Sequence, residues 1–319
     1  MKKLIMIVFA LWAGVSWADK VKVEILVTDY ENHPIKGAKV TFRTRATRKA
    51  PFWRPAEDAD YVARTDGSGL AQKSFHCWSS RFECYVSADG YYDEVLPCQT
   101  LKSEPADPYS VRLIETTRNL QVSLRPRINP IPMYAHKKNL EWTAFGTNQW
   151  NSCGYDLMLD DWLPPKGKGL NADFIITNIG TVDDDALKST CILEFKDGAG
   201  AYIVSDNSAG NHWIVYTADT NACYKSEFVA TRSQSISGSE EKEELLLQAG
   251  QCLVLRTRVI KNIKGEIVSC NYSKIYGPMS IAGIFRFAQS CYNPNANDPN
   301  LEFDCNRNLV RRTCGAFRP

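Results

Sequence analysis

The chain has 319 residues, of which 44% are hydrophobic and 23% are charged, a composition typical of a globular protein rather than a disordered one. Its formal net charge is +2, but removing Lys2 and Lys3 from the 38 basic residues leaves 36, equal to the 36 acidic residues. A neutral balance argues against binding of nucleic acid or another polyanion as the main function. At roughly 100–200 residues per domain, the length predicts two domains.

Residues 1–18 have the pattern of a cleaved export signal. Lys2 and Lys3 precede an apolar run over residues 4–15, and Ser16-Trp17-Ala18 ends in a small residue. The apolar run is too short to cross roughly 30 Å of hydrocarbon as a helix, and no later segment approaches that length, so we expect no membrane span. The sequence therefore predicts a secreted or periplasmic protein that is cleaved after Ala18.

Residues 19–125 are predicted to form short strands joined by turns. The first strand shows a period of two, in which polar residues alternate with Val21, Val23, Ile25 and Val27. Residues 40–42, 82–86 and 120–124 repeat this pattern, and residues 65–69 form a Gly-containing turn. Several strands at spacings of about 8–12 residues favour a β-sandwich.

The turns of this first domain resemble those of a known family. The matching segments are Val27-Thr28-Asp29, Pro34-Ile35-Lys36-Gly37-Ala38-Lys39-Val40, Thr65-Asp66 with Gly69, and Ala88-Asp89-Gly90-Tyr91-Tyr92. They are similar to the carboxypeptidase regulatory-like domain, which is related in fold to transthyretin. The resemblance implies a seven-stranded β-sandwich over residues 19–125, and it implies no activity.

A Pro-rich segment follows. Pro126, Pro130 and Pro132 fall within seven residues and favour an extended spacer. We therefore expect a linker over residues 126–139 and a second domain over residues 140–319.

The second domain is also predicted to be rich in strands, with a larger, sandwich-like β fold. Its clearest hairpin runs over residues 252–276 around a turn at 262–265. Register counted from that turn places Leu253 and Leu255 on the same face as Cys270, with Cys252 on the opposite face. Residues 239–248 fit either a short helix or a charged turn that enters a strand.

Four phrases of this domain resemble segments of uncharacterised exported bacterial proteins, in which a regulatory-like sandwich precedes such a domain. They are Gly154-Tyr155-Asp156-Leu157, Asp161-Trp162-Leu163-Pro164-Pro165, Tyr272-Ser273-Lys274-Ile275-Tyr276-Gly277 and Asn300-Leu301-Glu302-Phe303-Asp304. The resemblance brings no activity with it.

The 11 cysteines all follow the export signal, and in an oxidising compartment they are expected to form disulfides with one thiol left over. Three of them lie before the linker and eight after it, so the odd thiol is expected in the first domain. A metal site is the alternative, but the chain contains no CxxC motif.

An acidic group around a Trp-containing turn is the candidate metal site. Asp156, Asp160 and Asp161 supply hard oxygen ligands, which are the ligands that calcium prefers. The alternative is that these carboxylates cap the backbone of a surface turn. Calcium is the only cofactor that the sequence suggests.

A basic stretch with a tryptophan is the candidate ligand-binding site. Arg43, Arg45 and Trp53 combine cations with an aromatic ring, a combination that suits an anionic glycan or a phosphate-bearing surface. The alternative is the solvated face of a strand, because Arg43 and Arg45 alternate with the apolar positions 40 and 42.

Catalytic motifs are absent from the sequence: there is no GxSxG elbow, no HExxH and no P-loop pattern. Trp142, Trp150, Trp162 and Trp213 suit either a carbohydrate-stacking platform or a core. The sequence therefore predicts an exported, non-catalytic binding or surface-interaction protein whose ligand is a glycan or a cell-surface protein. A hydrolase of polysaccharide or peptide, and a structural subunit of an envelope assembly, are the alternatives.

Overall fold

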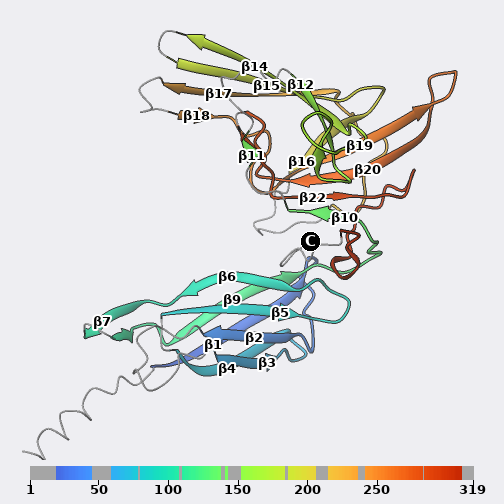
Figure 1. Ribbon diagram of the computed structural model, residues 1–319. Helices are drawn as coiled ribbons and strands as arrows, with labels where there is room; N and C mark the ends of the chain where they lie inside the picture. Colours follow the sequence, from blue (N-terminus) through green and yellow to red (C-terminus); the bar gives the residue numbers. More distant parts are fainter. Residues whose placement is uncertain are drawn as a thin grey trace, which may run out of the picture. The chain divides into compact units, whose positions relative to one another are not determined.

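The computed structural model describes residues 19–44, 59–77, 80–107, 110–137, 141–142, 152–183, 186–205, 215–235, 241–282 and 284–310. These residues form strands and connecting turns, with a single 3₁₀ turn at Cys305–Arg307, so the predicted all-β class is confirmed (Figure 1). The chain divides into unit 1, residues 1–127, and unit 2, residues 128–319. The predicted export signal lies outside the described residues, and within them no helix has the length and apolarity to cross a bilayer.

Unit 1 is a seven-stranded β-sandwich with one additional hairpin. Its three-stranded sheet has the order β4-β1-β9, and its four-stranded sheet has the order β3-β2-β5-β6. The strands are β1 (Asp19–Asp29), β2 (Lys39–Thr44), β3 (Ala59–Arg64), β4 (Leu70–Cys77), β5 (Arg81–Ser87), β6 (Glu94–Thr100) and β9 (Thr117–Leu124), and the additional hairpin is β7 (Ser103–Asp107) with β8 (Ser110–Leu113).

The core of unit 1 follows from the period-two pattern. The side chains of Val21, Val23, Ile25 and Val27 on β1 are fully buried, as the alternation predicts. In the turn before β4, Gly69 has φ +76° and its hydrogens lie close to the carbonyl oxygen of Val27, a place that admits no Cβ.

Unit 2 contains two larger sheets. The six-stranded sheet has the order β13-β12-β14-β15-β17-β18, and the five-stranded sheet has the order β10-β22-β20-β19-β16. The strands of the first are β12 (Ser152–Asp156), β13 (Asp161–Trp162), β14 (Phe174–Asp183), β15 (Ala186–Glu194), β17 (Glu227–Ser235) and β18 (Glu241–Glu243). Those of the second are β10 (Tyr134–His136), β16 (Gly200–Ser205), β19 (Gln251–Lys261), β20 (Ile267–Tyr276) and β22 (Gln289–Tyr292), and β11 (Glu141–Trp142) pairs separately with β21 (Ile284–Phe285).

The two sheets of unit 2 differ in how many of their faces are covered. One core cluster contains residues of both sheets, among them Tyr155, Leu193 and Leu253. A second cluster lies on the other face of the five-stranded sheet. There Cys252 and Val254 of β19 pack with Met133 and Phe303, which lie outside the central strands of that sheet. The five-stranded sheet is therefore buried on both faces, which explains the unbroken burial of residues 252–255.

The predicted linker needs correction, whereas the predicted hairpin is confirmed. The segment 126–139 is not a spacer along its whole length, because Ile131 pairs with Phe303 and Tyr134–His136 form β10 of the five-stranded sheet. The 252–276 hairpin is confirmed as β19 and β20. The charged residues 241–243, predicted to form a short helix or a turn, instead form strand β18, which pairs with β17.

The predicted register of this hairpin holds only at Ile260, which pairs with Ser269, and is wrong both at the turn, where Lys261 pairs with Ile267, and beyond a bulge. Between Thr257 and Ile260 the strand β19 carries one residue more than β20, and Arg258 there has φ +51°. The extra residue reverses which side chains share a face, so Cys252 and Cys270 lie in the same cluster. Among the ten described cysteines no pair is joined by a disulfide, so the predicted disulfide linkage is not supported.

Candidate functional site

Asp156, the first of the three predicted calcium ligands, is buried and surrounded by backbone donors. Its two carboxylate oxygens accept hydrogen bonds from four backbone N–H groups at 2.9–3.2 Å, those of Met158, Leu159, Leu170 and Asn171. Only 1% of the residue is exposed. These contacts tie together the two ends of the loop that follows β12.

A second buried carboxylate lies beside Asp156, and one arginine binds both. The Arg258 guanidinium donates from Nη2 to Asp156 Oδ1 at 2.9 Å and from Nε to Asp173 Oδ1 at 3.0 Å, and it lies 4.6 Å from the ring centroid of Tyr292. Burial raises the pKa of Asp173, and the hydrogen bonds from Arg258 oppose that rise. Burial also lowers the pKa of Arg258, but the hydrogen bond to Asp173 and the negative charges of Asp173, Tyr292 and Asp156 together outweigh this effect, so the net shift is upward.

The other two predicted ligands face different partners. Asp160 accepts a hydrogen bond from the Tyr155 hydroxyl at 2.6 Å, and Asp161 accepts from the backbone N–H groups of Trp162 and Lys168 at 2.8 and 2.9 Å. Within the described ranges, no group of three or more His, Cys, Asp or Glu side chains is arranged to hold a metal ion. The geometry of Asp156 and Asp161 therefore fits the backbone-capping alternative, whereas Asp160 binds a side-chain hydroxyl, and calcium binding remains a prediction.

Of the predicted ligand-binding residues, only Arg43 is described; Arg45 and Trp53 lie outside the described residues. Arg43 forms a bidentate pair with Asp60 of β3, at 2.8 and 2.9 Å, and its guanidinium carbon lies 5.1 Å from the ring centroid of Tyr85. This acidic partner was not recognised from the sequence, because Asp60 reaches Arg43 through the β2–β3 register.

The described residues do not show the carbohydrate-stacking platform of tryptophans that the sequence analysis considered. Trp162 is buried in the core, while Trp150 and Trp213 lie outside the described residues, as does the side chain of Trp142. Tyr30 is the one aromatic side chain among the exposed large hydrophobics there.

The feature that sequence reasoning missed is the solvent face of the six-stranded sheet. Ile192 on β15 lies directly opposite Val229 on β17, and Ile179 on β14 lies diagonally across from Ile192. Ile179 is 51% exposed and Val229 is 47% exposed. The side chains on the solvent face of an antiparallel sheet are normally polar. A neighbouring set of β-branched apolar side chains on that face is therefore unusual. We call Ile179, Ile192 and Val229 the apolar row.

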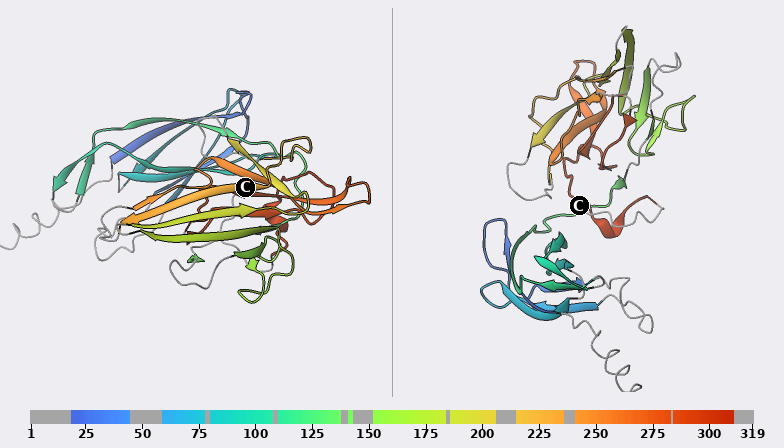
Figure 2. Two further views of the ribbon diagram at one scale, coloured as in Figure 1. Left: turned by 90° about the horizontal axis from the view of Figure 1, so that it is seen from above. Right: turned by 90° about the vertical axis from the view of Figure 1, so that its left-hand side faces the viewer.

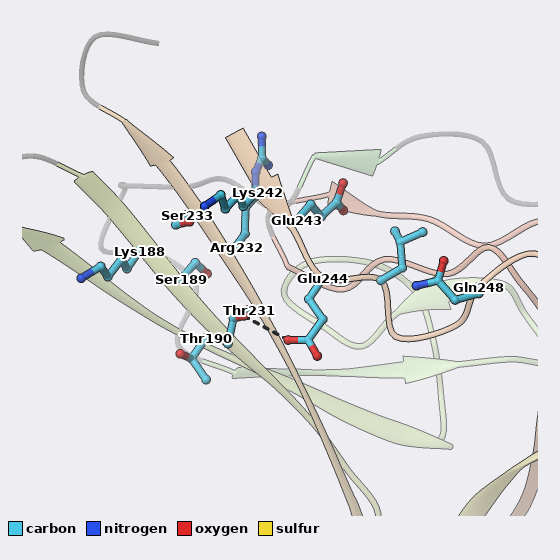
Figure 3. Close-up of a pocket in the computed structure, with 11 residues that line it drawn as sticks. Lys188, Ser189, Thr190, Thr231, Arg232, Ser233, Lys242, Glu243, Glu244 and Gln248 are labelled. Carbon is cyan, nitrogen blue, oxygen red and sulfur yellow. Dashed lines mark hydrogen bonds between the residues drawn. The ribbon is translucent and has the colours of Figure 1, made fainter. Parts of the chain in front are cut away.

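A polar depression of about 630 Å³ adjoins the apolar row over β15, β17 and β18 (Figure 3). Six of its lining side chains belong to the solvent face by register, and they are Lys188, Thr190, Thr231, Ser233, Lys242 and Glu244. The Thr231 hydroxyl donates to the Glu244 carboxylate at 3.0 Å, as the dashed line in Figure 3 shows. Hydroxyl groups and charges of both signs thus border the apolar row on this side.

Two further residues that line the depression, Ser189 and Glu243, belong by register to the other face of the sheet and anchor its strands. Ser189 is 1% exposed and donates from its hydroxyl to Asn178 Oδ1 at 2.6 Å. Glu243 accepts from the Ser280 hydroxyl and pairs with Arg286 at 3.5 Å. These bonds hold β14 to β15 and β18 to the rest of unit 2, so the solvent face is presented by a fixed backbone.

Comparisons with known proteins give no family. No protein-family model matches the chain, and no curated protein matches it. Among solved structures, hydroxyquinol 1,2-dioxygenase from Pseudomonas putida is similar with 11% identity and a TM-score of 0.26, covering 35% of this chain and 58% of that chain.

Two pilins are similar over more of the chain. A streptococcal ancillary pilin has 10% identity and a TM-score of 0.21, covering 86% of this chain and 63% of its own. The shaft pilin of Lactobacillus rhamnosus GG has 12% identity and a TM-score of 0.21, covering 84% of this chain and 94% of its own. At these values the similarities carry no functional argument.

Proposed function

We propose that this chain is an exported, non-catalytic binding protein that contacts a protein partner through the apolar row and the polar depression of unit 2. The observation that carries the proposal is the exposure of Ile179 and Val229, which lie on either side of Ile192 on one sheet face. Protein–protein interfaces combine an apolar centre with a polar rim, and the row and the depression supply these two parts.

The chemistry of the surface favours a protein over a glycan. Sugar rings are commonly held by stacking on aromatic faces, and the residues that line the depression include no aromatic side chain. Backbone and polar groups of a protein partner suit the hydroxyls of Thr190, Thr231 and Ser233, while apolar side chains of the partner would cover the row.

The same observations do not favour the hydrolase alternative. A glycosidase needs two carboxyl groups that face a substrate-sized space. Two neighbouring buried carboxylates that the structure describes, Asp156 and Asp173, instead share the Arg258 guanidinium.

Unit 1 fits the role of a support within this proposal. Its seven strands agree in number with the carboxypeptidase regulatory-like domain that its turns resemble. The Asp66 carboxylate accepts from the backbone N–H groups of Ser68 and Leu70 and so closes the turn that belongs to the resemblance.

The test is partner capture by purified variants of the full chain. Ile179→Asp and Val229→Asp place a carboxylate in the apolar row, and Ile203→Asp is the matched control, since Ile203 is a 38% exposed β-branched residue on β16 of the other sheet. We expect wild type and Ile203→Asp to bind one cell-surface protein, and the two row variants to bind it at least about tenfold more weakly.

Two results would count against the proposal. One is binding of the partner protein by Ile179→Asp and Val229→Asp with wild-type affinity. The other is turnover of a polysaccharide or peptide that a single Asp or Glu substitution abolishes, which would establish the hydrolase instead. Melting curves that match wild type confirm that each variant is folded.

A further inference from the structure

The hairpin of β19 and β20 carries a second exposed apolar surface at its turn. The hairpin extends beyond the neighbouring strands of its sheet (Figure 1), and the same projection is visible from above (Figure 2). Ile263 at the turn is fully exposed, while Ile260, Val268 and Ile267 beside it are 59%, 50% and 39% exposed. We call these four residues the apolar tip.

The turn holds the apolar tip in this exposed position. Asn262 Oδ1 accepts from the backbone N–H groups of Lys264 and Glu266 at 2.9 and 3.0 Å, and Gly265 closes the turn with φ +82°. A turn with this many bonds cannot fold Ile263 back onto the sheet, so the exposure of Ile263 is a property of an ordered backbone.

The charges around the tip are those of two lysines and one glutamate. Lys261 and Lys264 flank Ile263 in sequence and are both exposed. The one carboxylate, that of Glu266, accepts a hydrogen bond from Asn262 Nδ2 at 2.7 Å. Two ammonium groups and one carboxylate leave a net positive charge beside the apolar apex, which matches the layering of a bilayer, in which anionic headgroups lie above the hydrocarbon.

We propose that the apolar tip docks on the surface of an anionic lipid bilayer, inserting Ile263 among the headgroups while Lys261 and Lys264 contact lipid phosphates. The size and shape of the tip favour a bilayer over a protein. A stable protein interface needs roughly 800 Å² on each partner, more than four side chains on a convex turn present, whereas interfacial insertion requires only a few apolar side chains. This surface is separate from the row and depression, so unit 2 has one surface for a protein and another for a membrane.

The test measures co-sedimentation of the full chain with vesicles of phosphatidylcholine containing about 30% phosphatidylglycerol. We expect wild type to bind these vesicles and Ile263→Asp to bind about 10- to 100-fold more weakly, since one isoleucine side chain leaves the hydrocarbon boundary. Lys261→Gln and Lys264→Gln should each weaken binding about fivefold, and binding should fall as salt is raised.

Ile179→Asp is the matched control, because it changes an exposed isoleucine of the same unit that lies in the apolar row. It should bind vesicles like wild type while losing the protein partner, and Ile263→Asp should show the reverse. Failure of wild type to bind vesicles, or equal binding by Ile263→Asp, would overturn the proposal. If Ile263→Asp loses a protein partner and wild type ignores vesicles, the tip is a protein contact and the membrane proposal is wrong.

Discussion

Replacing Arg258 by alanine is expected to destabilise unit 2 strongly. The substitution leaves Asp156 and Asp173, both fully or almost fully buried, without the cation that binds them in the described part of the chain. Breaking a buried ion pair by removing one partner costs about 3–5 kcal/mol, and because the Arg258 side chain is 21% exposed we expect about 3 kcal/mol. For a unit of this size, that loss lowers the melting temperature by about 6–12 °C.

A second variant separates the charge effect from the backbone effect at the same position. Arg258 has φ +51°, a conformation that costs a non-glycine residue about 1 kcal/mol and costs glycine almost nothing. Arg258→Gly should therefore be about 1 kcal/mol more stable than Arg258→Ala. At an ordinary strand position the order is the opposite, so an alanine variant that is more stable than the glycine variant would refute the assigned bulge.

The pH dependence of the same substitution follows from Asp173. Its folded-state pKa is already raised by burial above the ordinary value of 3.8, and losing Arg258 raises it further. A carboxyl group with a raised folded-state pKa destabilises the fold above that pKa, and the penalty disappears as the pH falls toward the unfolded value. The difference between wild type and Arg258→Ala, measured by urea unfolding, should therefore be smaller at about pH 4.5 than at neutral pH. A difference that grows on acidification would contradict this account.

Two further predictions concern the turn of unit 1 and the thiols. Gly69→Ala should cost about 2–4 kcal/mol in a thermal or urea unfolding measurement, because φ is +76° and a Cβ would lie 2.5 Å from the Val27 carbonyl oxygen. The matched Gly67→Ala, where a Cβ meets nothing within 4 Å, should change stability by less than about 1 kcal/mol. Alkylation of the native protein, read by peptide mass spectrometry, should be fast at exposed Cys98 and Cys223 and slow at Cys84, Cys252 and Cys291, since burial raises the pKa of those thiols to about 12, 12 and 11. Exposed thiols that react only after addition of a reductant would instead indicate disulfides.

The sequence predicted well those elements that depend on local pattern. Strand β1 was predictable because the apolar side chains of Val21 to Val27 occupy alternate positions, and the β19–β20 turn because Asn262 and Gly265 satisfy its backbone. The register beyond Arg258 was not predictable, since a bulge is stabilised by tertiary partners, here Asp156 and Asp173.

The candidate site was harder to predict because it is assembled across strands. Ile179, Ile192 and Val229 each look like an ordinary strand residue, and their adjacency depends on the pairing of β14, β15 and β17. The acidic group was recognised from the sequence. Whether its carboxylates bind calcium or cap the backbone depends on N–H groups that lie as far along the chain as Asn171. The exposed Ile263 could have been noticed from sequence, as an isoleucine inside the Asn-Ile-Lys-Gly turn.

Site-specific photo-crosslinking on the cells that produce the protein tests the central claim most directly. A benzophenone-bearing residue placed at Val229 reports on the apolar row, and one at Ile203 serves as the control on the other sheet. The proposed function predicts that Val229 crosslinks to one defined protein and Ile203 does not. Crosslinks at neither position, or the same products from both, would contradict a protein-binding role for this face.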